Sequence, residues 1–237
     1  MESNFLLYAY FGINGDEEKD EIIKKAGARA YLDMCRTIDF GMSTEEKLSN
    51  KCRENLRNEV KEILVKAYYS LKNSVRASDE STQEKFDEEH RETCDKISSV
   101  YRKIGGLTFG QAQKWLNMTL KYLVVIQTYI CKVDVNDMIP YLHVPVDKYI
   151  MEAAGAKKKG LSCGLGLKCV PRKHEKSDTY KMGWYSENGS QPWSRWQYCE
   201  YIEFQQAVRH TISEKKIALN PIDWESKAWM EVANLKA

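Results

Sequence analysis

The sequence predicts a mainly α-helical protein with one small, irregular, glycine-rich insertion. Apolar residues recur at helical spacing through most of residues 16–131. Residues 155–192 hold much of the glycine and little periodicity, and helical spacing returns from about residue 194. Because the chain has 237 residues, of which 43% are hydrophobic and 30% charged, it can bury a substantial core.

Four helices are expected in the first part of the chain. The apolar patterns place them at residues 16–40, 43–75, 82–103 and 109–131. Ser43 and Glu46 have the spacing of a capping box, which supports a helix start there. The fourth stretch is the most apolar, so we expect it to be the central helix.

The second part of the chain is expected to be less regular. Pro145 holds its segment extended, and a short helix follows Asp147. Residues 155–192 form either a long loop or a small β excursion. A helix is expected over about 194–216, and Pro221 then starts a tail.

The composition of the chain indicates in which cellular compartment the protein is expected. No apolar run is long enough to span a membrane, and residues 1–10 lack the basic region of a signal peptide. The seven cysteines are odd in number and scattered, which indicates reduced thiols in a cytoplasmic protein. The net charge of +2 argues neither for nor against a nucleic-acid partner.

Two motifs in residues 104–155 carry the functional signal. The first is a glycine-bearing turn, I-G-G-L-T-F-G-Q-A, which opens a long helix. The second is H-V-P-V-D, residues 143–147, an extended segment that brings one carboxylate to the start of another helix. Aspartate is also a favoured helix N-cap. A structural role and a catalytic role for Asp147 therefore both remain open.

Together these motifs resemble the helix-hairpin-helix DNA glycosylases over roughly residues 100–155, and H-V-P-V-D looks most like the segment of the 8-oxoguanine glycosylases. The resemblance implies a multi-helix glycosylase-like fold, a nucleotide flipped out of the DNA stack, and Asp147 as the catalytic carboxylate. It also implies that the hairpin and the helix start hold the DNA backbone. The corresponding DNA-binding candidates are Gly106, Thr108, Gly110 and Gln111.

The lysine of the bifunctional family members has no clear counterpart. Those members place it just after the hairpin glycine, where this chain has Gln111 and Ala112. The nearest lysine is Lys114, and the interval from Lys114 to Asp147 is longer than the family's usual spacing. We therefore expect a monofunctional enzyme, with Lys114 as a second candidate nucleophile. No four-cysteine iron–sulfur motif is present, so the resemblance implies no cofactor.

The start of the fourth helix is unusually polar for a central helix. A solvated face and a face that lines a DNA groove or base pocket both remain open for Gln111, Gln113, Lys114 and Asn117. Aromatic side chains near residues 184–201 pack in a core by default, but they can also stack on a flipped base. The candidate base pocket consists of Gln113, Asn117, His143, Trp193 and Trp196.

Residues 155–176 are strongly basic. Such a segment is either a solvated loop or a surface that follows phosphates. Lys157, Lys158 and Lys159 are therefore further DNA-binding candidates. A zinc site can also be considered for Cys163, Cys169 and His174. Their spacing lacks C-x-x-C and a fourth ligand, so we expect no metal.

Four regions follow from these patterns. They are a helical region at 1–103, the helix-hairpin-helix and aspartate segment at 104–155, the basic insertion at 156–192, and a C-terminal helical region at 193–237 that packs on the first.

The function hypothesis is a DNA glycosylase that flips out and hydrolytically excises a damaged or modified base and leaves an abasic site. The role is DNA repair or defence against modified foreign DNA. The expected partner is double-stranded DNA that contains such a base, bound by a monomer. The alternative is a non-enzymatic helical module that binds DNA or a protein partner. A helical scaffold without a nucleic-acid role is a third class.

Overall fold

The computed structural model describes residues 2–38, 49–76, 79–155, 161–167 and 192–235, together with short strands between 171 and 190. The fold is mainly α, as predicted. The chain divides into two compact units. Unit 1 comprises residues 1–107 and 111–142, and unit 2 comprises residues 108–110 and 143–237.

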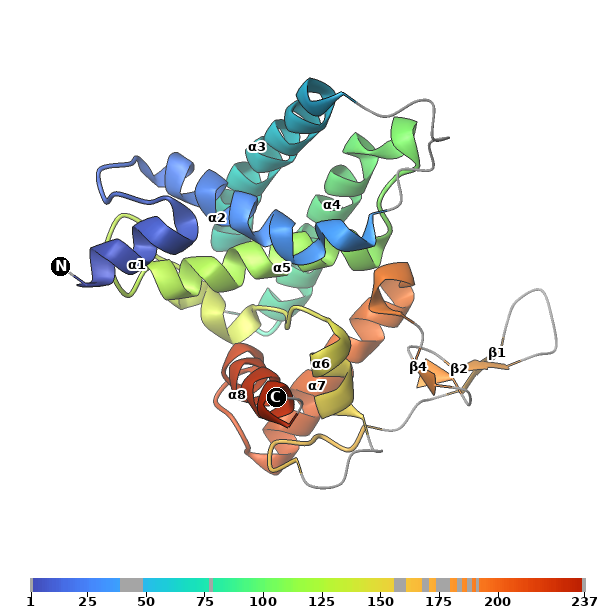
Figure 1. Ribbon diagram of the computed structural model, residues 1–237. Coiled ribbons are helices and arrows are strands. Elements are labelled where there is room, and N and C mark those ends of the chain that lie inside the picture. Colours follow the sequence, from blue (N-terminus) through green and yellow to red (C-terminus); the bar gives the residue numbers. More distant parts are fainter. Residues whose placement is uncertain are drawn as a thin grey trace. The chain divides into compact units, whose positions relative to one another are not determined.

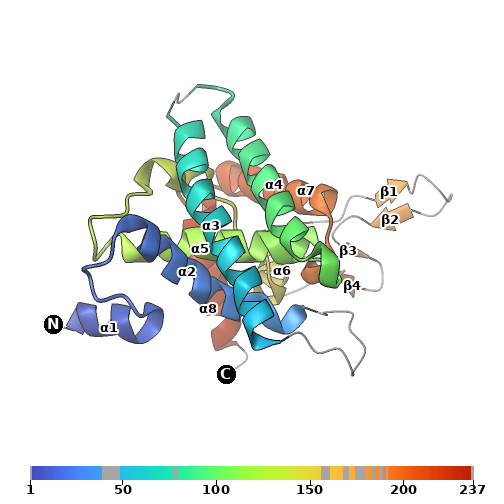
Figure 2. The same cartoon turned by 90° about the horizontal axis from the view of Figure 1, so that it is seen from above.

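Unit 1 is an assembly of helices (Figure 1). Its elements are α1 (Glu2–Phe11), α2 (Lys19–Met34), η1 (Cys35–Thr37), α3 (Asn50–Ser74), α4 (Thr82–Val100), η2 (Arg102–Ile104), most of α5 (Phe109–Ile126) and η3 (Asn136–Tyr141). Helix α3 packs along α4 and against α2, and Figure 2 shows α3 and α4 side by side. Helix α1, which was not predicted, packs on α2 and buries its own Leu7.

The central position of α5 is confirmed by its burial. Residues 109–120 are all buried. Trp115 of α5 donates its indole N–H to the carbonyl oxygen of Gly27 on α2 at 2.8 Å. A Cβ at Gly27 would lie 2.7 Å from Cδ1 of Leu64 on α3, so any larger residue there would require the Leu64 side chain to shift.

Helix boundaries differ from the prediction at several ends. The helix predicted at 16–40 corresponds to α2 followed by η1, which ends at Thr37. Helix α3 starts at Asn50, where the hydroxyl of Ser49 accepts the Cys52 N–H at 3.2 Å. The capping box predicted at Ser43 and Glu46 lies outside the described residues.

Helix α5 ends at Ile126 rather than near residue 131. Short-range bonds tighten the chain there, because the N–H groups of Thr128 and Tyr129 bond three residues back. The side chain of Gln127 then accepts the N–H of Val135 at 2.8 Å.

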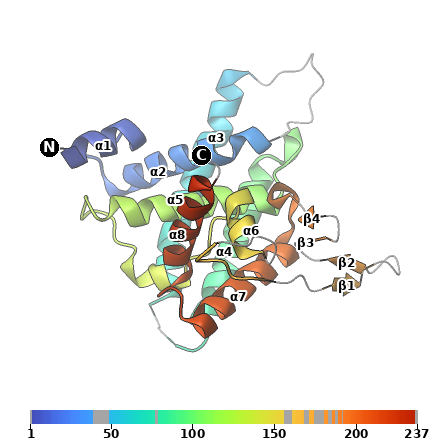
Figure 3. The same ribbon diagram turned by 60° about the horizontal axis from the view of Figure 1, so that its bottom comes forward.

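Unit 2 is built on three helices, α6 (Lys148–Ala154), α7 (Tyr198–Lys215) and α8 (Pro221–Asn234). Helix α8 packs on both α6 and α7, as Figure 3 shows. The predicted tail is wrong, because residues 221–234 form a regular helix. Asn220 caps it by accepting the Asp223 N–H at 3.0 Å, and Pro221 occupies its first turn, where a missing N–H costs nothing.

The described residues of the insertion include four strands of two or three residues each. Strands β1 (Pro171–Lys173) and β2 (Tyr180–Met182) pair antiparallel, as do β3 (Tyr185–Ser186) and β4 (Gly189–Ser190). The 3-10 turn η4 (Trp193–Arg195) then leads towards α7. In the described part of the chain, no helix is long and apolar enough to cross a membrane.

Residues of the predicted region 104–155 are found in both units. Helix α5 from Gln111 onward belongs to unit 1 with the N-terminal helices. The segment that carries Asp147 belongs to unit 2 with the C-terminal helices.

Candidate active site around Asp147

The extended segment before Asp147 is held tightly by α7. The side-chain amide of Gln205 brackets Val144, since its Oε1 accepts the Val144 N–H at 3.0 Å and its Nε2 donates to the Val144 carbonyl oxygen at 2.9 Å. One residue earlier, Nδ1 of His143 lies 2.7 Å from the hydroxyl of Tyr201. These four residues are all buried. The backbone that leads to Asp147 therefore has little freedom.

Asp147 is the N-cap of α6. Its Oδ1 accepts the N–H groups of Tyr149 at 2.9 Å and Ile150 at 3.0 Å. Its backbone is extended, as an N-cap requires. The side chain is partly exposed. The structural role expected for Asp147 is thus confirmed, and the cap bonds also fix the direction of its carboxylate.

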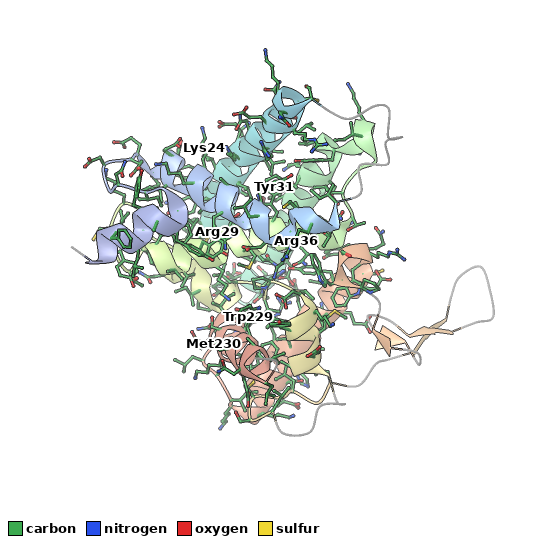
Figure 4. All side chains as sticks on the ribbon, viewed as in Figure 1. Lys24, Arg29, Tyr31, Arg36, Trp229 and Met230 are labelled. Carbon is green, nitrogen blue, oxygen red and sulfur yellow. The ribbon has the colours of Figure 1, made fainter. Side chains whose placement is uncertain are left out.

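An aromatic pair lies next to this cap. The ring of Tyr149 packs against Trp229 of α8, with centroids 5.4 Å apart and planes inclined by 38°. Trp229 is 41% exposed, and Met230 beside it is 55% exposed (Figure 4). This pair was not predicted, because a tail was expected from residue 221 onward. The available signal for a helix was Asn220 followed by Pro221, with Trp224, Ala228 and Val232 then recurring every four residues.

The polar start of α5 is buried, so the solvated-face alternative is wrong. Gln111, Gln113, Lys114 and Asn117 are each less than 10% exposed. Nε2 of Gln111 donates to the carbonyl oxygen of Thr37 at 2.5 Å. Burial of four polar side chains on one helix is costly without partners.

Hydrogen bonds connect part of this face to α4. Nδ2 of Asn117 donates to Oε1 of Gln113 at 2.9 Å. Oδ1 of Asn117 then lies 2.7 Å from Nε2 of His90, and since an amide oxygen only accepts, this ring nitrogen carries the proton. Nδ1 of the same ring lies 3.7 Å from the Cys94 thiol. Burial raises the pKa of that thiol well above its usual range, so it keeps its proton and can donate to Nδ1.

The hairpin does not present its glycine amides as the resemblance implies. Gly105 and Gly106 both have positive φ, and the Gly106 N–H donates to the Tyr101 carbonyl oxygen at 2.8 Å. The Gly110 N–H donates to the Trp196 carbonyl oxygen at 3.0 Å. These two amides are therefore engaged within the protein, and the expectation that they donate to DNA phosphates is corrected for this conformation.

The return of the chain before α7 explains this difference. The hydroxyl of Thr108 donates to the Ser194 carbonyl oxygen at 2.5 Å. A Cβ at Gly110 would lie 1.8 Å from the carbonyl oxygen of Trp193. The sequence could not show that residues 193–196 lie directly on residues 108–110. Glycine at 110 is therefore needed for this approach.

The aromatic candidates divide by burial. Trp196 is fully buried and packs on Phe204 with ring centroids 5.4 Å apart. It is a core residue, as is His143, and neither presents an open stacking surface. Trp193 is partly exposed. Lys157, Lys158 and Lys159 lie outside the described residues, as do Cys169 and His174.

The thiol of Cys163 is hydrogen-bonded to a carboxylate. It donates to Oε2 of Glu231 at 2.6 Å. Burial and the neighbouring carboxylate raise the pKa of this thiol to about 12, while the bonds from residues 162 and 163 lower the pKa of Glu231 to about 2. A protonated thiol is neither a metal ligand nor a nucleophile. This loop therefore serves to fasten residues 162–163 to α8.

Comparisons of the chain with protein-family models, with curated proteins and with solved structures find no match.

Proposed function

We propose that this protein is a DNA glycosylase that hydrolyses the N-glycosidic bond of a damaged or modified base, with Asp147 as its essential carboxylate. One observation carries the proposal. The Asp147 side chain stands partly exposed at the end of a buried extended segment that α7 clamps on both sides. The resemblance of H-V-P-V-D to the catalytic segment of the helix-hairpin-helix glycosylases supports the same residue.

In this reaction one carboxylate assists hydrolysis at C1′ of the sugar. As the C1′–N bond breaks, its electron pair leaves with the base, and positive charge develops on the sugar. A water oxygen then bonds to C1′ and loses a proton, which leaves an abasic site. A fixed carboxylate stabilises the developing charge or accepts the proton of the water. Because Oδ1 of Asp147 is held by two backbone N–H groups, the carboxylate needs little reorganisation during the reaction.

The proposal is tested by release of a base. The protein is incubated with duplexes that contain oxidised or alkylated bases and with phage genomes that carry natural hypermodified bases. Alkali then cleaves the strand at abasic sites, and mass spectrometry identifies the free base. We expect alkali-dependent breaks in at least one of these DNAs. A protein that releases no base from any of them is not a glycosylase of this kind.

A second candidate is a helical protein that binds DNA or a protein without catalysis. The observation that favours it is the complete use of Oδ1 of Asp147 in capping α6. The same screen separates the two, because this candidate binds its partner but releases no base.

The exposed aromatic pair gives a second prediction. Replacing Trp229 by Ala is expected to weaken binding of the substrate duplex about tenfold, because stacking of one base on an aromatic ring contributes about 1–3 kcal/mol. Trp229→Phe keeps a ring on Tyr149 and is the matched control. Binding is measured by fluorescence anisotropy. Equal affinity of the Ala variant and the wild type would show that Trp229 does not meet the DNA.

A third prediction concerns whether a covalent intermediate forms between the protein and the sugar. We expect hydrolysis without an imine intermediate, because imine formation needs a positioned, deprotonated amine, and Lys114 is only 4% exposed. Borohydride added during turnover should trap no covalent protein–DNA adduct, and strands should break only after heat or alkali. An adduct that forms in the wild type and disappears in Lys114→Gln would identify Lys114 as a nucleophile.

A further inference from the structure

Helix α1 carries an exposed apolar surface, which we call the outer face and define as Phe5, Leu6, Tyr8 and Ala9. The first three side chains are 69%, 60% and 58% exposed, and Ala9 is exposed as well. No residue from 5 to 13 carries a charge. A helix that is apolar on all sides is normally buried, and contiguous exposed apolar surface marks sites of association.

The opposite side of α1 is fastened to the rest of unit 1. Leu7 is buried, and one turn further on the ring of Phe11 packs against Tyr122 of α5 with centroids 5.2 Å apart. The hydroxyl of Tyr10 accepts a hydrogen bond from Nη2 of Arg29 on α2 at 2.7 Å (Figure 4 labels Arg29). These contacts hold α1 in one orientation on unit 1.

The order of residues along α1 places the outer face away from these contacts. With about 3.6 residues per turn, Leu7 and Phe11 lie on one side of the helix. Phe5 and Ala9 are also one turn apart and lie on the opposite side. The middle of the outer face therefore consists of one large side chain followed by one small side chain.

We infer that two copies of this chain associate through the outer face, with their α1 helices antiparallel. In a two-fold pair centred level with Leu7, Phe5 of each copy lies opposite Ala9 of the second copy. A ring that faces a methyl group lets the two helices approach closely at both positions. The outer face is thus complementary to itself. The inference goes beyond the proposed function, uses no property of DNA, and replaces the monomer expected from the sequence.

The charges that follow α1 favour the antiparallel pair. Residues 16–21 contain five carboxylates and a single cation, Lys19. In a parallel pair these acidic segments would lie side by side and repel one another. An antiparallel pair separates them by the length of α1, about 15 Å, which exceeds the screening length of physiological salt. The same acidic segment disfavours an anionic membrane, which attracts helices flanked by cations.

The exposed area is sufficient for a weak dimer. Because an aromatic side chain can bury about 150–250 Å², the exposed parts of residues 5–10 offer roughly 500 Å² in each copy. Two copies together would bury roughly 1,000 Å², which is the lower limit for a specific interface. We therefore expect a dissociation constant on the order of 10 µM, since interfaces at that limit are weak.

The first test measures the mass of the full chain in solution. Sedimentation velocity and light scattering are recorded from about 1 to 100 µM protein, a range that brackets the expected dissociation constant. The wild type should change from monomer to dimer within this range. A wild type that stays monomeric throughout would overturn the inference.

The outer-face variant combines Phe5→Gln, Leu6→Gln and Tyr8→Gln. Glutamine is a good helix former and Leu7 is unchanged, so α1 should stay folded on unit 1. An unchanged circular dichroism spectrum and melting temperature check this. Association should weaken by at least about a hundredfold, because large apolar side chains in the middle of an interface contribute most of its affinity.

The control variant combines Leu219→Gln, Met230→Gln and Leu235→Gln, which removes three exposed apolar side chains of unit 2. It should dimerise like the wild type. If the control variant loses the dimer as fully as the outer-face variant does, association depends on general apolar exposure and the inference is wrong.

The antiparallel pairing is tested with Phe5→Lys and Ala9→Glu. Each variant alone places an unpaired charge against an apolar side chain of the second copy, so each should be monomeric where the wild type dimerises. In an equimolar mixture, the introduced ammonium group of one chain lies opposite the introduced carboxylate of the other, and a mixed dimer should form. A mixture that stays monomeric would overturn the antiparallel pairing.

A membrane is the competing occupant of the outer face. The wild type and the outer-face variant are sedimented with vesicles of phosphatidylcholine and phosphatidylserine. We expect neither protein to sediment with the vesicles. A wild type that is monomeric in solution and sediments with vesicles, while the outer-face variant does not, would assign this face to a membrane and overturn the inference.

Discussion

Asp147→Asn is expected to lower base excision by at least about a hundredfold, the usual scale for loss of a catalytic carboxylate or an equivalent electrostatic group. Asn keeps the size of the side chain but removes its negative charge. The charge is what stabilises the developing positive sugar, so the chemical step is affected directly. The measurement is the single-turnover rate of base release from the substrate duplex that the screen identifies.

The cap geometry allows the charge of Asp147 to be removed without loss of the helix cap. The amide oxygen of Asn can accept the N–H groups of Tyr149 and Ile150 as Oδ1 of Asp147 does, so α6 should stay folded. Affinity for DNA and the melting temperature should therefore change little. Asp223→Asn, in the first turn of α8, makes the same chemical change at another helix start and should leave excision intact. Undiminished excision by Asp147→Asn would remove Asp147 from the mechanism.

Local patterns predicted much of the fold. Apolar spacing identified the cores of α2, α3, α4, α5 and α7, because these helices bury one face or more. The Pro145–Asp147 segment also had a local explanation, since proline favours extended backbone and aspartate caps the next helix. The short helix after Asp147 follows from these two rules and is confirmed as α6.

Contacts between distant parts of the chain were not predictable. Polarity at the start of α5 suggested water or DNA, whereas Asn117 is paired with Gln113 and His90 inside unit 1. Glycine at 110 suggested a phosphate-binding turn, whereas it admits the carbonyl group of Trp193. In both cases the residue type has several physical uses, and the partner that selects one use lies far away in the sequence. The pair Tyr149 and Trp229 was missed for the same reason.

The close approach at Gly110 leads to the largest expected effect on stability. In a helix, Gly→Ala alone would stabilise by about 1 kcal/mol. At this position the new Cβ would stand 1.8 Å from the Trp193 carbonyl oxygen and 3.0 Å from its carbonyl carbon. Both are backbone atoms, so residues 193–196 must move away. That movement strains or breaks the bond from the Gly110 N–H to Trp196 and the bond from Thr108 to Ser194.

We therefore expect Gly110→Ala to lower the free energy of unfolding by about 3 kcal/mol, the sum of a backbone clash and two weakened buried hydrogen bonds less the helix-propensity gain. For a chain of this size, the melting temperature should fall by roughly 6–12 °C. Gly106→Ala is the informative comparison, because its Cβ meets open space and only its positive φ opposes alanine, at about 1–2 kcal/mol. The free energy of unfolding of both variants and of the wild type is measured by urea denaturation. If Gly110→Ala is as stable as the wild type, residues 193–196 do not lie on the start of α5, and the Gly110 amide would again be available to a phosphate.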